Sequence, residues 1–420
     1  MGVKLLLAGW YGHDDTLAKP LSPRLWLKRV ERWVREAAGD VLEGTRVVDS
    51  PQGPILLLRL HPAADEVAIV AAGQGRVVVS ANTSMVGPGY HCALCDLLHA
   101  LGDAVGVEWA DPALTTAGVG DPTGYFHTGN AEEIAPRMLA WLGYMAGRLL
   151  ALRQQGQSGA LLSLRAGHHF EHPGAVLTPL GPRDEAWLRA VHADPQQGRD
   201  IFPWWEPGPG APERLGRALS RIWTEMVWRP PLMEEERQRS RDVARLLEQA
   251  WREDPTLAYP WREWQQVLGY LGVGGTLAEE VSRRAAQAPP GPLSGYRRGA
   301  VQVTLPEGWE IRIPGSLAEQ RLEDGSWVAR DHRRSVRFLP LEDVRGIAPG
   351  PEGELPYEFQ HQGERVSGRA TLHKEPGEYR LTALCEAGER RALCVVSFDD
   401  PEEQEWALGT WRSLDHAAAA

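Results

Sequence analysis

Cysteine is scarce in this chain, and long apolar runs are absent. Its 420 residues contain four cysteines, in two local pairs, Cys92/Cys95 and Cys385/Cys394. So few cysteines exclude a disulfide-stapled secreted scaffold, and we expect free thiols. No apolar run approaches the roughly 20 residues of a membrane-spanning helix, and no basic-then-apolar leader opens the chain. We therefore expect a cytoplasmic protein without a membrane partner.

The motifs that identify common enzyme classes are also absent. The sequence has no G-x-S-x-G elbow and no phosphate-binding loop ending in Lys-Ser/Thr. The net charge of −11 argues against a nucleic acid as direct ligand, because such a binder needs a basic face. These absences favour a protein that is not an enzyme.

The first 160 residues predict an α+β layer. A strand is expected over residues 3–9, and a helix begins at Ser22-Pro23, where Ser suits the N-cap and Pro the first helical position. Residues 45–81 contain four short β-branched segments between Gly/Pro turns, which favours an antiparallel meander. Helices at about 90–105 and 131–154 would cover one face of this sheet.

The rest of the chain predicts two further parts. Residues 161–285 are mixed and then helical and rich in tryptophan, and we expect them to extend the first body. Residues 286–299 are rich in Pro and Gly and predict a linker. Residues 300–415 are rich in strand patterns and end in a helix. The predicted fold class is therefore α+β: an antiparallel sheet with covering helices and a helical extension, followed by a smaller α/β domain.

The segment LPEGWEIRIPGSLAEQ (305–320), together with a hairpin that leads into an acidic helix (399–414), resembles the PsbP-like fold. The resemblance covers about a quarter of the chain. It implies a small domain with an antiparallel sheet and flanking helices. It also implies binding to other proteins, since relatives include chaperone or adaptor modules of bacterial secretion systems. No functional residue is carried over from it.

Residues 76–106 hold the densest reactive chemistry, in the pattern of a strand, a Gly/Pro loop and a helix. His91 and Cys95 are separated by one helical turn and so share a helix face, which suits a pair of metal ligands. His99 continues the same face. The competing interpretation is core packing, because the helix is apolar around much of its circumference and buried Cys behaves as a small hydrophobe.

A second histidine cluster follows at GHHFEHPG, with His168, His169 and His172. The cluster would converge only if a turn intervenes, which Pro173-Gly174 permits. His168 and His172 could then complete a metal site with His91 and Cys95. We expect no cofactor, with zinc at these residues as the alternative. The competing interpretation is a polar loop at a sheet edge.

Two aromatic motifs lie beside proline. They could form a rigid recognition surface or fill joints between helices and sheet. Their residues are Phe202, Trp204, Trp205, Tyr259, Trp261 and Trp264.

Taken together, these patterns predict a non-catalytic binding protein. We expect an adaptor, or an immunity or inhibitor component of a bacterial conflict, defence or secretion system. The acidic charge suits a basic protein partner. One alternative is a metal-dependent hydrolase that uses the His/Cys cluster. The other is a small-molecule or nucleotide sensor, in which loop 82–90 offers backbone N–H groups to an anion.

Overall fold

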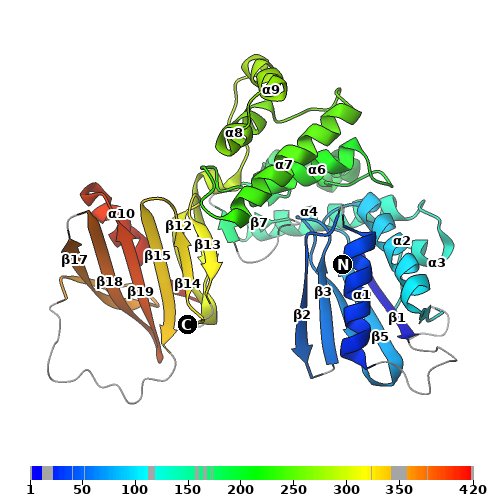
Figure 1. Cartoon of the computed structure of the whole chain (residues 1–420), viewed down its shortest axis with the longest axis horizontal. Helices are drawn as coiled ribbons and strands as arrows, with labels where there is room; N and C mark the ends of the chain where they lie inside the picture. Colours follow the sequence, from blue (N-terminus) through cyan, green and yellow to red (C-terminus); the bar gives the residue numbers. More distant parts are fainter. Residues whose placement is uncertain are drawn as a thin grey trace.

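The structure is a computed structural model of the whole chain (Figure 1). It describes residues 2–11, 22–39, 41–51, 53–111, 119–156, 160–162, 164, 168–170, 172, 174–322, 324–341, 357–375 and 377–417.

An antiparallel sheet forms the base of the N-terminal part. Its six strands lie in the order β2-β3-β4-β5-β1-β6, so the meander continues through β5 and the first strand inserts beside its end. The predicted meander is confirmed. The bounds are β1 Lys4–Tyr11, β2 Gly44–Ser50, β3 Gly53–Arg59, β4 Val67–Ala71, β5 Arg76–Asn82 and β6 Val107–Trp109.

Two helices cover one face of this sheet, α1 (Pro23–Ala37) and α2 (Pro88–Val105) (Figure 1). Helix α1 begins after Ser22 with Pro23 in its first turn, as predicted. Its buried side chains include Trp26 and Val30, and they join the alternate strand residues in one core. The predicted helix at 131–154 exists as α4 (Ile134–Gln154), but it packs mainly against α5 (Glu185–Ala193) and the 3-10 segment Pro195–Ile201, and less against α2. The covering role predicted for α4 therefore belongs to α1.

The central part is helical and lies above the sheet edge in Figure 1. Helices α6 to α9 share one core that contains Trp264 and Tyr259. Their bounds are α6 Ala211–Thr224, α7 Glu234–Glu253, α8 Trp261–Leu271 and α9 Thr276–Gln287. Between α4 and α6 lie the short strands β7 Ala160–Leu161, β8 His168–Phe170, β9 Val176–Thr178 and β10 Gly181–Arg183.

The C-terminal part contains two antiparallel sheets around a separate core, with α10 (Gln404–Arg412) packed against it. The larger sheet has the order β13-β14-β15-β19-β18-β17-β16 and the smaller one β20-β12-β11-β8. The bounds are β11 Ala300–Thr304, β12 Trp309–Pro314, β13 Ala318–Arg321, β14 Trp327–Arg330, β15 Arg334–Leu341, β16 Phe359–Gln362, β17 Ser367–Glu375, β18 Glu378–Ala387, β19 Arg390–Phe398 and β20 Asp415–His416. The α+β class is confirmed.

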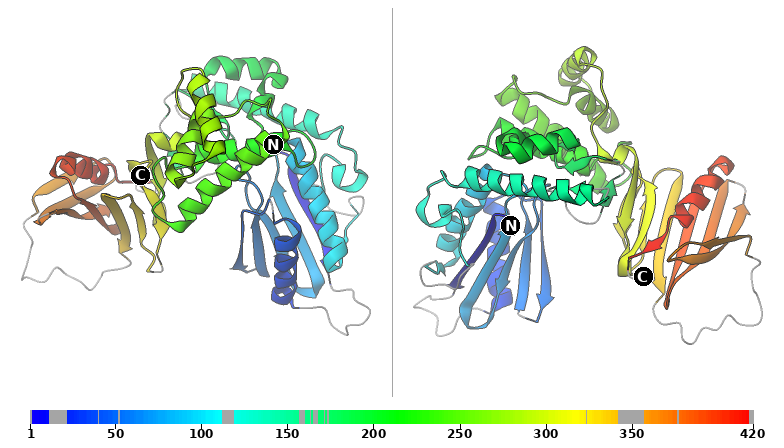
Figure 2. Two further views of the ribbon diagram at one scale, coloured as in Figure 1. Left: turned by 45° about the horizontal axis from the view of Figure 1, so that its top comes forward. Right: turned by 180° about the vertical axis from the view of Figure 1, so that it is seen from behind.

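The C-terminal part recruits an element from the middle of the chain. Strand β8 pairs with β11, so the C-terminal sheet begins with residues 168–170. The end of the predicted linker is not an extended spacer. Tyr296 is buried, and its hydroxyl group donates to the carbonyl oxygen of Thr178 while it accepts from the N–H of the same residue. The chain from 296 onward is thus packed into the junction between the parts, which the two views of Figure 2 show from other sides.

Candidate functional site

The turn between β5 and α2 is held by close backbone contacts. Gly87 has a φ of 126°, a conformation that favours glycine, and a Cβ at this residue would lie 2.4 Å from the carbonyl oxygen of Trp204. Pro88 occupies the first turn of α2, where its missing N–H costs no helical hydrogen bond. The predicted order of strand, loop and helix is therefore confirmed.

Backbone groups at this turn are already bonded within the protein. The N–H of Gly89 donates to the carbonyl oxygens of Trp204 and Trp205, and the N–H of Trp204 donates to the carbonyl oxygen of Val86. Residues 83–92 are all buried. The turn offers no open N-terminus for an anion, so the geometry does not support the nucleotide-sensor alternative at loop 82–90.

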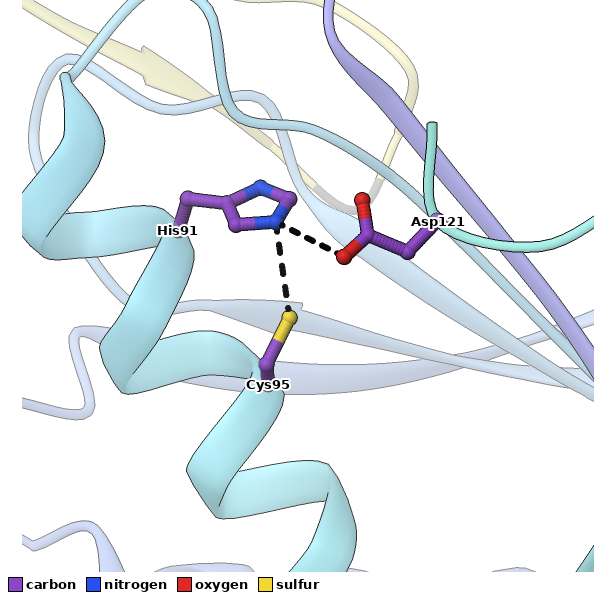
Figure 3. A group of neighbouring side chains, drawn as sticks. All are labelled: His91, Cys95 and Asp121. Atoms are coloured by element: carbon purple, nitrogen blue, oxygen red, sulfur yellow. Dashed lines mark hydrogen bonds and ion pairs between the residues drawn. The ribbon is translucent and has the colours of Figure 1, made fainter. Parts of the chain in front are cut away.

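One turn into α2, His91 meets groups from three segments. Its Nδ1 lies 2.9 Å from the hydroxyl oxygen of Thr83, at the end of β5. Its Nε2 lies 3.3 Å from Asp121 Oδ2 and 3.6 Å from Cys95 Sγ. His91 and Cys95 project from one face of α2 toward Asp121, which belongs to the loop that precedes α3 (Tyr125–Thr128) (Figure 3). We call His91, Cys95 and Asp121 the His–Cys–Asp cluster.

The Asp121 carboxylate is fixed by its own loop. It accepts hydrogen bonds from the N–H and hydroxyl groups of Thr123, and from the N–H of Phe126 at 2.9 Å. Burial alone would raise the pKa of Asp121, but the hydrogen bond and charge of His91, with these backbone donors, hold its pKa well below the usual value. The carboxylate therefore stays ionised inside the protein.

The cluster is a poor candidate for thiol catalysis. Burial, followed by the charge of Asp121, raises the pKa of Cys95, so the nucleophilic thiolate is disfavoured. Both Cys95 and Asp121 face Nε2 of His91, whereas a catalytic relay places nucleophile and acid on opposite ring nitrogens. The side chains of His91 and Asp121 are 0% exposed, and Cys95 is equally buried, so a substrate has no direct access.

The neighbouring predicted residues take other roles. Cys92 faces a second core, which contains α4, and burial raises its pKa to about 11. His99 contacts the carbonyl oxygen of Phe126 through Nε2 and stacks on the Phe126 ring. Neither belongs to the His–Cys–Asp cluster. Asp121 and Thr83, by contrast, were not predicted.

The second histidine cluster does not join the first. Strand β8 carries His168 and pairs with β11 of the C-terminal part, whereas the first cluster lies in the N-terminal layer. The ring of His172 contacts the ring of Tyr296, with 5.2 Å between centroids. The side chains of His168 and His169 lie outside the described residues. The prediction that His172 would share a site with His91 and Cys95 is therefore wrong, because tertiary pairing carries this segment toward the C-terminal sheet.

The aromatic motifs are largely interior. Phe202, Trp204, Tyr259 and Trp264 are buried, and Trp205 and Trp261 are partly exposed. Residues 202–206 lie against the start of α2 and against α6, where a Cβ at Gly216 would lie only 1.8 Å from the Pro203 carbonyl oxygen. The two motifs therefore do not form the exposed aromatic surface that the recognition hypothesis needs, and the packing alternative is favoured.

The N-terminal sheet instead presents apolar side chains on its second face. Cross-strand partners lie on the same face of a sheet, and these partners form one transverse row over five strands. Val78 is 37% exposed, and Trp10, one step along the sheet, is 41% exposed. No described helix or strand lies over this face, which is seen from behind in Figure 2. We call it the open sheet face; its row is Val48, Ile55, Val70, Val78 and Ala8. The row is flanked by Leu57, Ala68, Leu6 and Trp10, with the polar Ser80 between Ala68 and Leu6.

A cavity of 590 Å³ lies where the three parts meet. Arg59 of β3, Glu225 after α6 and Glu319 of β13 contribute to its wall. Its charged groups largely face one another: Arg59 and Arg239 both lie near Glu225, at 3.9 and 3.7 Å, and Arg297 binds Glu319 at 2.9 Å. This mutual neutralisation marks a joint between parts and favours no particular ligand.

In comparisons with protein-family models and with curated proteins, nothing matches this chain. Within the described residues, every helix is too short or too polar to cross a bilayer.

Proposed function

We propose that this chain is a non-catalytic protein-binding protein, an adaptor or an immunity or inhibitor component of a bacterial conflict, defence or secretion system. The observation that supports this proposal is the open sheet face. An antiparallel sheet with one covered face commonly carries polar residues on the other, so we interpret the apolar second face as the centre of a partner interface.

The dimensions of this face suit the centre of a protein interface. Five strands at about 4.8 Å spacing make the row about 19 Å wide, and the distance from Leu6 to Trp10 along β1 adds about 14 Å. The resulting area of about 270 Å² is smaller than the roughly 800 Å² that a stable interface buries on each partner. It corresponds to an apolar centre that needs a polar rim. Charged residues at its border include Arg46, paired with Glu66 at 2.7 Å, and Arg76.

The partner that we propose is a second protein that presents an apolar face. The apolar row requires a complementary apolar surface, and the net charge of −11 favours approach of a positively charged partner. The C-terminal part belongs to the same proposal, as a PsbP-like module that contributes protein contacts. The hydrolase alternative is less well supported, because the His–Cys–Asp cluster has no exposed side chain.

The experiment compares two substitutions in the full chain. Val78→Glu places a charge on the open sheet face, and Val273→Glu places the same charge at another exposed valine, 43% accessible, after α8. In cells of the source organism, a photoreactive residue at Trp10 should cross-link a partner whose recovery is lost with Val78→Glu and retained with Val273→Glu. Equal recovery with both variants would refute the proposed surface. A cross-link only between copies of the chain, with a dimer abolished by Val78→Glu, would assign the face to self-association and refute the adaptor function.

A further inference from the structure

We propose that the His–Cys–Asp cluster binds one Zn²⁺ ion. This site lies in the interior of the N-terminal layer and is independent of the proposed partner surface. An imidazole nitrogen, a thiolate sulfur and a carboxylate oxygen are all ligands that zinc uses in proteins. In the part of the chain that the structure describes, His91, Cys95 and Asp121 bring these donor atoms within 4.8 Å of one another.

The two donor distances from His91 Nε2 fit a tetrahedral ion. With Zn–N and Zn–O bonds of about 2.0–2.2 Å and a Zn–S bond of about 2.3 Å, a tetrahedron has an N–O edge of about 3.3–3.5 Å and an N–S edge of about 3.5–3.6 Å. The observed separations are 3.3 Å from His91 Nε2 to Asp121 Oδ2 and 3.6 Å from His91 Nε2 to Cys95 Sγ. Both edges that start at His91 Nε2 thus match a tetrahedral ion, and the third pair, Asp121 and Cys95, lies within 4.8 Å.

The hydrogen bonds of Thr83 direct a lone pair of His91 toward the site. The Thr83 hydroxyl group lies 3.2 Å from the carbonyl oxygen of Val3 and donates its single proton there. It must then accept from the Nδ1–H of His91, which leaves Nε2 as the ring nitrogen that binds either a proton or a metal ion. Nε2 faces the Asp121 carboxylate, so one of these two lies between the ring and the carboxylate.

A metal ion would bind one more side chain of the cluster than a proton would. A protonated His91 would satisfy Asp121, whereas a metal ion would also bind the Cys95 sulfur, which lies 3.6 Å from the same nitrogen. One thiolate and one carboxylate would neutralise the charge of Zn²⁺, and a site without net charge suits a fully buried position. The Thr123 hydroxyl group, 3.1 Å from Nε2, donates to the Asp121 carboxylate and so fixes this carboxylate beside the site.

The test uses the purified full chain, stripped with a chelator and titrated with Zn²⁺ or Co²⁺. We expect one zinc per chain by elemental mass spectrometry. We also expect the visible bands of tetrahedral Co²⁺ with a thiolate-to-cobalt charge-transfer band. Cys95→Ser should abolish that charge-transfer band, while Cys92→Ser, the neighbouring cysteine on the same helix, should keep it. Thr83→Val should weaken zinc binding about 10–100-fold, as loss of an orienting partner does.

Two results would overturn the proposal. One is wild-type protein that binds no zinc and gives no tetrahedral cobalt spectrum. The other is unchanged metal binding in Cys95→Ser. If that variant fails to fold, the wild-type cobalt spectrum decides, because only a bound thiolate produces the charge-transfer band. None of these readouts depends on the partner, so this proposal and the proposed function can fail separately.

Discussion

Glu43 joins the N-terminal layer to the helical part, and its charge should be essential to that joint. It lies between α1 and β2, its side chain is 2% exposed, and it binds Arg217 of α6 at 3.0 Å. It also binds Arg221, one turn further along α6. Glu43→Gln keeps the shape and one carbonyl acceptor but removes the charge that two buried arginines share.

The expected loss of stability in Glu43→Gln depends on the ion pairs that the two arginines retain. Breaking a buried ion pair from one side typically costs about 3–5 kcal/mol, because the other charge stays buried. Arg217 retains Glu213 at 3.3 Å and Arg221 retains Glu225 at 3.4 Å, so we expect the lower end, about 3 kcal/mol. The matched control is Asp49→Asn in β2. Its ion pair with Arg24 is 65–70% exposed and should contribute less than about 1 kcal/mol.

Hydrogen exchange measured by mass spectrometry suits this test, because a chain of several parts has no single free energy of unfolding. Amides of α6 and of β2–β3 should exchange about 100-fold faster in Glu43→Gln, since every 1.4 kcal/mol is a factor of ten. Those of β17–β19 should not change. Exchange in Glu43→Gln that matches Asp49→Asn would refute the reasoning that Glu43 holds the two parts together.

Three further predictions concern packing and pH. Trp204→Ala should lower the free energy of local opening at α2 by about 3–5 kcal/mol through the loss of a buried indole, measured by hydrogen exchange of the α2 amides. Substitution of the partly exposed Trp205 by Ala should lower it less. Gly87→Ala should destabilise α2 more than Gly106→Ala. Both glycines have positive φ, but only at Gly87 would the new Cβ meet backbone, and hydrogen exchange of the first turn of α2 measures the difference. The pKa of Glu236 lies below its usual value because Arg229 and the backbone N–H of Leu232 outweigh burial, which raises it. The stability from Glu236 is therefore present above the unfolded pKa of about 4.3 and lost as the pH falls through the lower folded value. Between about pH 5 and pH 2, the stability of α7 should depend less on pH in Glu236→Gln than in the wild type. An equal pH dependence in the two proteins would contradict this.

The fold was predictable where local pattern and burial agree. Ser22-Pro23 marked the start of α1, and the β-branched segments of 45–81 became β2 to β5, because alternation and Gly/Pro turns are local signals. The pairing of β8 with β11 was not predictable in this way, since it joins residues about 130 apart. The same applies to the end of the linker. Tyr296 is buried there and contacts Thr178, which sequence spacing does not reveal.

Two of the three residues of the His–Cys–Asp cluster followed from helical spacing, and the third depended on a distant loop. His91 and Cys95 share a face because they are four residues apart, but Asp121 lies 30 residues from His91, in a segment rich in glycine. Its signal was an Asp two residues before Thr123, a pattern typical of a side chain that accepts from its own loop. The hypothesis that the aromatic motifs form a binding surface was not supported. Composition identifies large aromatic side chains, but it does not show which residues surround them.

The open sheet face also had a signal in the sequence. PILLLRL, EVAIVAA and RVVVSA are apolar at consecutive positions, not at alternate ones, and such runs indicate strands with two apolar faces. In β5, Val77 and Val79 face the covered core while Val78 faces outward. Since neighbouring residues of a strand point to opposite faces, a charge at Val78 alters the open face without entering the core that supports His91. The partner surface and the proposed zinc site thus lie on opposite sides of one sheet, so Val78→Glu and Cys95→Ser test the two proposals separately.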